Sequence, residues 1–461
     1  MAALIFNLIL IVAVGLQAMP LISVAAQAQR ALLHQYNPTQ DEFSRNVGTV
    51  LTFVIHAAAA GDKLIRRTLQ DRRPVTLPLV SGYELGNVNY YVRPVVGSTR
   101  RSFYMTMDTA ADLTWLQCQP CHPCFEQLDQ PIFDPRVDST TLSDIRGRSP
   151  LCNLLGAASI TSMPDSPTCT YLKVYQDGSM TAGKLVSDTL ALPDILFGCS
   201  HRSRSEQEGG FQDMAGIMGL SRGPLAFPSQ LRRRALPSTF SYCLPKMYSA
   251  DSSTLTFGTG GSHIAHNTVF TPLIINPEHP FYYYVHLTGI SIGSRFLDLP
   301  SGLFDIDPST GDGGLQIDSG AAITRLHPLA YHALRDTMQA IIAAHAPQLL
   351  PGEPYIDLLD TCYFLADGVQ HDHLLDGVPS VVLHFARAAD LVLPPDIVLM
   401  SLDKPDPDSD EHHPVCLSFS SSDINANFLR ATSVLGNIHQ QRTRFIFDVD
   451  NDRMGLTANE C

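Results

Sequence analysis

The sequence predicts a mostly β protein built from two related halves, and two observations favour this fold class. Short runs rich in β-branched and aromatic residues alternate with clusters of Gly, Pro, Asp and Ser, which is typical of strands joined by turns. An apolar run leading into an aspartate also occurs twice, at Asp108 and at Asp318. Each copy is followed much later by two apolar residues and a glycine, Gly219 and Gly436 respectively. A repeated β unit that delivers one acid per half predicts a pseudo-twofold arrangement, with the acids facing each other across a cleft.

Composition describes a turn-rich globular protein and not a disordered or fibrous one. The 461 residues are 44% hydrophobic and 16% charged, with 31 Gly and 32 Pro. This length favours two or three units over a single core. The net charge of −14 argues against nucleic acid or an anionic membrane as the main partner, because both require a basic face.

The first part of the chain has the features of an export signal. Residues 1–29 carry no charged side chain, and an apolar core precedes small residues at Ala26 and Ala28. We therefore expect a signal peptide over residues 1–28, although the usual basic start is missing. An uncleaved membrane anchor is the alternative, but Gln17 and Pro20 interrupt the apolar run. Once the signal is removed we expect no membrane association and a secreted protein, with the vacuole or a plastid as alternative destinations.

Residues 29–80 differ in charge from the rest of the chain. They carry a net charge of +3. Since the whole chain carries −14, the remaining residues carry −17. A basic segment ahead of an acidic body predicts a prosegment that covers an acidic cleft, with a flexible lead-in as the alternative. Residues 81–270 and 271–461 would then form the two β lobes.

The expected elements follow in chain order. The clearest helix is predicted over Pro328–Ala346, where apolar residues recur at helical spacing. Strands are predicted at Tyr90–Val96, Ser102–Asp108, Thr170–Tyr175, Leu185–Leu192, Thr254–Phe257, Tyr282–Ile292, Val381–Phe385 and Arg444–Val449.

The paired acids carry the functional prediction. Burying a carboxylate is costly unless its charge is shared or bound. Two carboxylates at hydrogen-bonding distance cannot readily both ionise, so they share one proton. The ionised partner can take a proton from a water molecule while the protonated partner polarises a peptide carbonyl, and this chemistry needs no metal or cofactor.

Several motifs carry a family resemblance: Asp108-Thr109-Ala110, Asp318-Ser319-Gly320, Tyr175-Gln176-Asp177-Gly178-Ser179 and Gly436-Asn437-Ile438-His439-Gln440-Gln441. On these motifs, Tyr90 to Cys461 resembles a pepsin-like aspartic peptidase of the nepenthesin-like plant group. The resemblance implies a bilobal, all-β pepsin-like fold with a few short helices. It also implies a monomeric aspartic endopeptidase, made as a zymogen, that acts on protein or peptide substrates.

The resemblance also implies roles for single residues. Asp108 and Asp318 would hold the attacking water. Tyr175 and Gly178 would belong to a flap that closes over substrate, and Trp115 would donate a hydrogen bond to the flap tyrosine. The aspartates would be supported by Thr109, Ala110, Ser319, Gly320, Gly219 and Gly436.

Three alanines depart from the family pattern and keep a second function open. Ala110 stands where the family usually has glycine, and Ala111 and Ala321 stand where it commonly has Ser or Thr. Losing both hydroxyl donors would raise the pKa values of the pair. The alternative function is a catalytically silent protein of the same fold that binds or inhibits another protein, as in related xylanase inhibitors.

The ten cysteines are even in number, which after an export signal predicts disulfides. The resemblance implies a Cys362–Cys416 bond and leaves the other pairings open. A zinc site at Cys118, Cys121 and Cys124 is the alternative, but His122 directly follows Cys121 and is poorly placed to complete it.

Overall fold

We describe a computed structural model of the chain. It describes residues 74–83, 87–127, 130–156, 167–175, 177–205, 213–258, 264–354, 358–366, 373–401, 414–423, 432–458 and 461. The predicted signal peptide, and the predicted prosegment up to residue 73, lie outside these described residues. Everything described below belongs to one compact unit, Arg73–Cys461.

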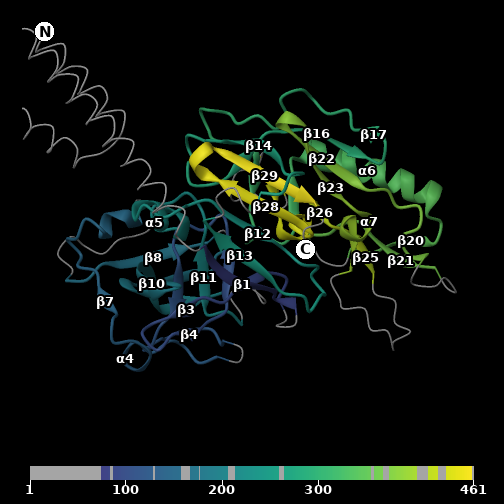
Figure 1. Ribbon diagram of the computed structural model, residues 1–461. Helices are drawn as coiled ribbons and strands as arrows, with labels where there is room; N and C mark the ends of the chain where they lie inside the picture. Colours follow the sequence, from purple (N-terminus) through teal and green to yellow (C-terminus); the bar gives the residue numbers. More distant parts are fainter. Residues whose placement is uncertain are drawn as a thin grey trace, which may run out of the picture. The chain divides into compact units, whose positions relative to one another are not determined.

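The first half of this unit consists mainly of strands (Figure 1). Its described residues include two short α-helices, α4 (Pro135–Asp138) and α5 (Phe227–Arg233). Its strands are β1 (Val75–Ser81), β2 (Tyr90–Val92), β3 (Val95–Val96), β4 (Arg101–Ser102), β5 (Met105–Asp108), β6 (Trp115–Gln117), β7 (Ser143–Asp144), β8 (Thr170–Val174), β9 (Met180–Leu190), β10 (Leu192–Arg204), β11 (Gly216–Gly219), β12 (Phe240–Cys243) and β13 (Ser253–Phe257).

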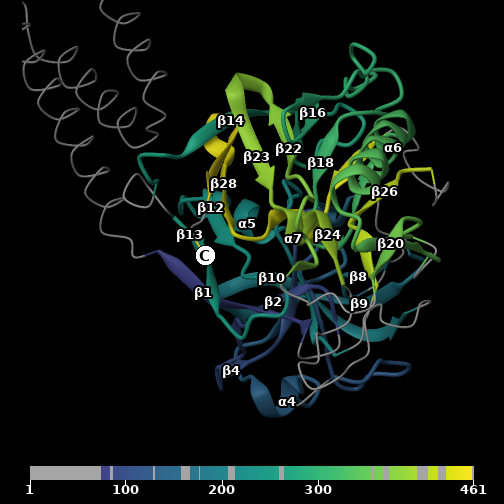
Figure 2. The same cartoon turned by 90° about the vertical axis from the view of Figure 1, so that its right-hand side faces the viewer.

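The second half is built in the same way and holds the longest described helix, α6 (Pro328–His345), with α7 (Pro395–Val398). Helix α6 packs beside β26, as Figure 2 shows. The strands are β14 (Val269–Ile274), β15 (Tyr284–Val285), β16 (Leu287–Ile292), β17 (Arg295–Phe296), β18 (Leu315–Ile317), β19 (Thr324–Leu326), β20 (Leu349–Gly352), β21 (Cys362–Leu365), β22 (Val381–Phe385), β23 (Ala389–Leu393), β24 (Leu399–Met400), β25 (Val415–Leu417), β26 (Phe419–Ser421), β27 (Ser433–Leu435), β28 (Thr443–Asp448) and β29 (Arg453–Ala458).

The prediction of a mostly β chain with few helices is therefore confirmed, and four predicted strands need correction. Tyr90–Val96 is divided at Arg93 and Pro94 into β2 and β3, and Ser102–Asp108 is divided at Phe103 and Tyr104 into β4 and β5. The run predicted as one strand over Leu185–Leu192 spans the turn between β9 and β10, where Ala191 has a positive φ of 59°. The run Tyr282–Ile292 is divided at His286 into β15 and β16, which pair in different sheets. Local composition could not reveal the breaks at Ala191 and His286, because the residues on both sides of each break favour strands.

The internal repeat corresponds to a repeated strand arrangement. In the first half, β5 runs parallel to β11 with Asp108 opposite Gly219, and β6 runs antiparallel to β11 and parallel to β10. In the second half, β18 runs parallel to β27 with Ile317 opposite Leu435, and β19 runs antiparallel to β27 and parallel to β26. Each acid thus lies at the same end of the same four-strand unit.

Strands from the ends of both halves join in one sheet. Strand β12 pairs antiparallel with β28, which pairs with β29, which pairs with β14; Figure 1 shows β28 and β29 in yellow beside β12 and β14. Residues two apart on a strand share a face, so Phe240 and Tyr242 face Phe445 and Phe447. The Phe240 and Phe447 rings stack with centroids 4.6 Å apart. These fully buried aromatic rings tie the two halves together through apolar contact.

All ten cysteines are paired in disulfides: Cys118–Cys199, Cys121–Cys124, Cys152–Cys169, Cys243–Cys461 and Cys362–Cys416. The last of these is the pair that the family resemblance implies. The three cysteines considered as zinc ligands are held in two of these bonds. Across the described residues, no helix combines the length and hydrophobicity needed to cross a bilayer.

Candidate active site

Two matching loops hold the predicted catalytic acids. Asp108 ends β5, and its Oδ1 accepts hydrogen bonds from the backbone N–H groups of Ala110 (2.7 Å) and Ala111 (3.0 Å). Asp318 follows β18, and its Oδ1 accepts from Gly320 (2.9 Å) and Ala321 (3.1 Å). Hydrogen bonds from backbone N–H groups favour an ionised carboxylate. Each carboxylate therefore accepts two backbone hydrogen bonds from equivalent positions in its loop.

The two loops are locked together by crossed hydrogen bonds. The Thr109 N–H donates to Ser319 Oγ (3.1 Å), and the Ser319 N–H donates to Thr109 Oγ1 (2.9 Å). Each hydroxyl also donates into the other half, Thr109 to the Ile317 carbonyl and Ser319 to the Met107 carbonyl, both at 2.9 Å. Thr109 and Ser319 are fully buried. Their four bonds hold the two acid loops in contact across the halves.

The Asp108 carboxyl lies so close to the second acid loop that Gly320 has no room for a side chain. A Cβ built on Gly320 would lie 2.7 Å from the Asp108 carboxyl carbon, and real Cβ atoms essentially never come so near another heavy atom. Ala110, at the equivalent place in the first loop, keeps its N–H bond to Asp108 and is not among the positive-φ residues. Alanine at this position therefore preserves the donor that a glycine would supply.

Burial and mutual repulsion raise the pKa of both acids. Burial is the largest cause for Asp108, followed by the charge of Asp318, and together they raise its pKa to about 7. The N–H donors and the Lys173 ammonium act in the opposite direction. Burial likewise raises the pKa of Asp318, against the Gly320 N–H and the Arg325 guanidinium. Neighbouring carboxyl groups whose pKa values are raised in this way can hold one proton between them, with one carboxyl protonated and the other ionised.

Restoring the missing hydroxyls is expected to lower the pKa values of the pair. Ala111 and Ala321 donate backbone N–H groups to the acids but have no side-chain donor to add. In Ala111→Ser/Ala321→Thr, we expect the acidic limb of the pH–rate profile to move to lower pH by up to about one unit. Profiles of the double variant and the unmodified protein on one peptide would show this. An unmoved acidic limb would contradict it.

The predicted flap residues lie on the β8–β9 hairpin. Trp115, on β6 and fully buried, donates from Nε1 to the Tyr175 hydroxyl at 2.7 Å. Tyr175 directly follows β8, and its N–H donates to the Ser179 carbonyl (2.8 Å). Gly178 has a φ of 83°, which favours glycine and closes the turn. Burial and then the Asp108 charge raise the pKa of Tyr175, so this phenol stays neutral near the first acid. Gln176 of the same turn lies outside the described residues.

Gly219 and Gly436 lie directly behind the two acid loops. A Cβ on Gly219 would lie 2.7 Å from the Ala111 carbonyl oxygen, and one on Gly436 would lie 2.4 Å from that of Ala322. Only glycine fits such close backbone contacts. Both predicted glycines are therefore brought against the acid loops.

Two threonines in the same loops were missed by the sequence interpretation. Thr114 Oγ1 accepts the Gly219 N–H at 3.1 Å, and Thr324 Oγ1 accepts the Gly436 N–H at 3.0 Å. Both threonines are fully buried. The repeat contained the signal, because each of these threonines stands at the same spacing after its aspartate.

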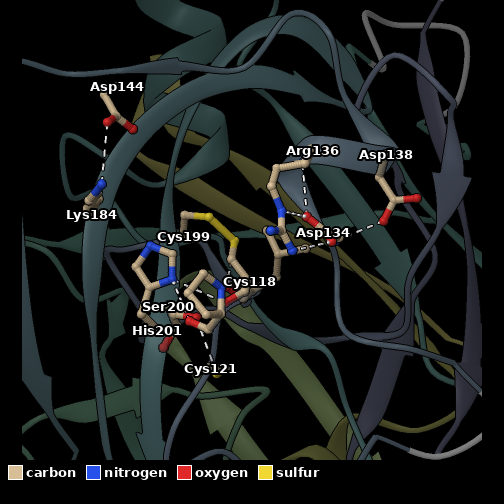
Figure 3. Close-up of a disulfide and its surroundings, with 12 residues drawn as sticks. Cys118, Cys121, Asp134, Arg136, Asp138, Asp144, Lys184, Cys199, Ser200 and His201 are labelled. Carbon is tan, nitrogen blue, oxygen red and sulfur yellow. Dashed lines mark hydrogen bonds and ion pairs between the residues drawn. A yellow bond between two sulfur atoms is a disulfide. The ribbon is translucent and has the colours of Figure 1, made fainter.

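A disulfide fastens the end of β6 beyond Trp115 (Figure 3). Cys118 is bonded to Cys199 on β10, which runs parallel to β6. His201, on the same strand as Cys199, lies with Nδ1 3.2 Å from the Cys118 carbonyl and 3.0 Å from that of Pro120. The short strand that carries Trp115 is thus held at its far end by covalent and polar links.

Comparison with known proteins identifies the family. The model for the xylanase inhibitor N-terminal region matches residues 90–259, and that for the xylanase inhibitor C-terminal region matches residues 282–458. Aspartyl protease family protein 2 of Arabidopsis thaliana is 37% identical over 83% of this chain and 73% of its own length. Aspartic proteinase nepenthesin-1 of Nepenthes gracilis is 30% identical over 82% of this chain and 79% of its own.

Solved structures agree on the fold. Basic 7S globulin from soybean has a TM-score of 0.61 at 18% identity, over 84% of this chain and 97% of that one. Such a likeness shows the fold alone, and it confirms the bilobal pepsin-like architecture. With the sequence relatives, it leads to one conclusion: the chain belongs to the plant family of pepsin-like aspartic peptidases that includes the nepenthesins.

Proposed function

We propose that this protein is an aspartic endopeptidase in which Asp108 and Asp318 activate a water molecule for peptide hydrolysis. The observation that carries the proposal is the pairing of two donor-lined carboxylates by the crossed bonds of Thr109 and Ser319. That arrangement keeps both acids in place without a rearrangement before reaction. Relatives named as aspartic proteinases add support.

The reaction needs only the proton that the pair shares. The ionised carboxylate accepts a proton from water as the water oxygen attacks the scissile carbonyl carbon, while the protonated carboxyl donates to the carbonyl oxygen. The resulting gem-diol collapses as the newly protonated carboxyl gives its proton to the peptide nitrogen, the newly ionised carboxylate takes a proton from a gem-diol hydroxyl, and the C–N bond breaks. One carboxyl ends protonated and the other ionised, as at the start. Tyr175, held by Trp115, would cover the substrate and exclude bulk water.

The test is proteolysis by the processed protein. After the prosegment is removed, we expect cleavage of a denatured protein substrate at acid pH and complete inhibition by pepstatin. The assay is run at several pH values between about 3 and 7, since raised pKa values extend the range in which one acid stays protonated. Absence of cleavage across this range, from a protein shown to be folded and processed, would overturn the proposal.

A second candidate is a silent binding or inhibitor protein of the same fold. It is favoured by the three alanines around the acids and by the family models, which carry the name xylanase inhibitor. The intact aspartate pair favours the enzyme over this candidate. Loss of xylanase activity on adding the protein, together with no proteolysis, would decide for the inhibitor.

Export through the secretory pathway is proposed as the route to its site of action. Five disulfides support this, because such bonds form and persist in oxidising compartments. The acidic body supports protein or peptide substrates over nucleic acid.

A further inference from the structure

An ion pair joins the flap hairpin to the first acid loop. The Lys173 ammonium on β8 lies 3.2 Å from Asp112 Oδ1, and Asp112 is four residues after Asp108. The two side chains are only 19% and 15% exposed. Lysine and aspartate are seldom so enclosed unless they are paired. This pair therefore marks a place where charge is held close to the site.

Both ends of the pair are fixed by backbone structure. Lys173 is opposite Thr181 in the β8–β9 ladder and precedes Tyr175 by two residues. Asp112 packs against Gly223: a Cβ built on Gly223 would lie 2.5 Å from the Cβ of Asp112. The pair thus links the hairpin that carries Tyr175 to the loop that carries Asp108, and the Trp115–Tyr175 hydrogen bond is a second link between that hairpin and the chain after Asp108.

The charges that face Asp108 come from several elements. Asp318, following β18, raises the pKa of Asp108, whereas Lys173 on β8 lowers it. The phenols of Tyr175 and Tyr282, whose own pKa values are raised, stay neutral near the acids. In the part of the chain that the structure describes, the cation acting on Asp108 is Lys173, and Arg325 acts on Asp318 instead.

We propose that Lys173, held by Asp112, is a positioning residue that keeps a fixed positive charge at the first acid loop and fastens the flap hairpin to that loop. This inference rests on the peptidase function proposed above. Residue 111 is alanine, so no side-chain hydroxyl at this position can donate to the ionised Asp108 carboxylate. The positive charge of Lys173 stabilises that carboxylate in part instead. It also holds the strand that leads into Tyr175 where that phenol can meet Trp115.

The kinetic test compares Lys173→Met with Lys173→Arg. Without the ammonium, the pKa values of the acid pair rise, so both limbs of the pH–rate profile move to higher pH by about half to one unit. KM is expected to rise as well, because the hairpin is less firmly held. Arginine keeps the charge and should leave the limbs near their original positions. Equal profiles for methionine and the unmodified protein would overturn the proposal.

Lys184 offers a matched control. Its ammonium lies 3.5 Å from Asp144, as Figure 3 shows, but both side chains are about 40% exposed and the pair lies outside the acid loops. Exposed pairs of this kind contribute little. Lys184→Met should therefore leave the pH–rate profile and KM unchanged. A shift as large as that of Lys173→Met would mean that the effect is general and not specific to the site.

A second measurement decides the inference without activity. Because burial raises the pKa of Asp108, the folded state loses stability as pH rises from about 4 to 7, and a higher pKa extends this loss to higher pH. Asp112→Asn and Asp112→Asn/Lys173→Met differ only in the side chain at residue 173. We expect the double variant to lose thermal stability over a wider and higher pH range.

If thermal stability depends on pH in the same way in both variants, the role of Lys173 is overturned, whether or not the protein cleaves peptides. If the curves differ as expected but the unmodified protein hydrolyses nothing, the peptidase proposal fails while the electrostatic role of Lys173 stands. The two proposals are therefore tested separately.

Discussion

Replacing Asp108 or Asp318 with asparagine is expected to abolish peptide hydrolysis and to stabilise the folded protein near neutral pH. Asparagine can still accept the Ala110 or Gly320 N–H group but can neither take a proton from water nor share one. Loss of this acid–base chemistry should lower kcat/KM at least about 10³-fold.

The gain in stability follows from the direction of the pKa shift. Burial raises the pKa of Asp108 above its unfolded value, so the carboxyl favours folding least at high pH, where it is ionised. Asparagine removes that penalty. For Asp108→Asn we expect the free energy of unfolding to rise by roughly 1–3 kcal/mol at pH 8 and to change little at pH 4. This range is smaller than the free energy equivalent to the full pKa shift of Asp108, because that side chain is only half-buried and solvent screens its charge.

The measurement pairs pepstatin-sensitive hydrolysis with urea unfolding at pH 4 and pH 8. Asp194→Asn serves as control, since the Asp194 side chain is 85% exposed and has a positive φ that asparagine tolerates. Lower activity with lower stability at both pH values would indicate general damage. Hydrolysis at the original rate would exclude Asp108 from the reaction.

Among the residues that the structure describes, His439 is expected to be the strongest single source of acid sensitivity. Its ring is fully buried, with Nδ1 2.6 Å from Thr324 Oγ1 and Nε2 2.7 Å from Ser418 Oγ. Ser418 donates its own proton to the Ile397 carbonyl, so Nε2–H must donate to Ser418 and Nδ1 must accept from Thr324. If the ring were protonated, the new hydrogen on Nδ1 would point at the hydroxyl hydrogen of Thr324, and this hydrogen bond would be lost.

Burial lowers the pKa of His439 to about 3, against about 6.5 for the unfolded chain. The stability that depends on the neutral ring is complete above pH 6.5 and is lost as pH falls toward 3, by up to about 5 kcal/mol. Glutamine can donate and accept but cannot be protonated in this range. In His439→Gln the loss between pH 7 and pH 3.5 should shrink by several kcal/mol.

Urea midpoints at the two pH values would measure this. His286→Gln is the matched control, because the His286 ring is 46% exposed and pairs with an exposed Asp305. An equal acid-induced loss in His439→Gln and the unmodified protein would contradict the assignment. Thr324 also accepts the Gly436 N–H, so charging His439 is expected to disturb the backbone contact behind the second acid loop.

The sequence alone predicted the mostly β architecture, the repeat and the two acids, because these depend on local motifs. It did not reveal Lys173 or His439 as notable, since their surroundings come from distant parts of the chain: Lys173 meets Asp112, and His439 meets Thr324 and Ser418. Apart from Cys362–Cys416, which the family resemblance implied, the disulfide partners were open for the same physical reason. Only the three-dimensional fold brings Cys118 to Cys199 across the intervening chain.

The Cys243–Cys461 bond has a practical consequence for a protein that would meet its own proteolytic activity. It closes a covalent ring across a sequence separation of 218, which contains the whole second acid loop. A single cut anywhere inside that ring leaves both pieces attached. Nicked molecules would run as one band without reductant and as two with it, so autolysis of this half would be invisible unless the sample is reduced.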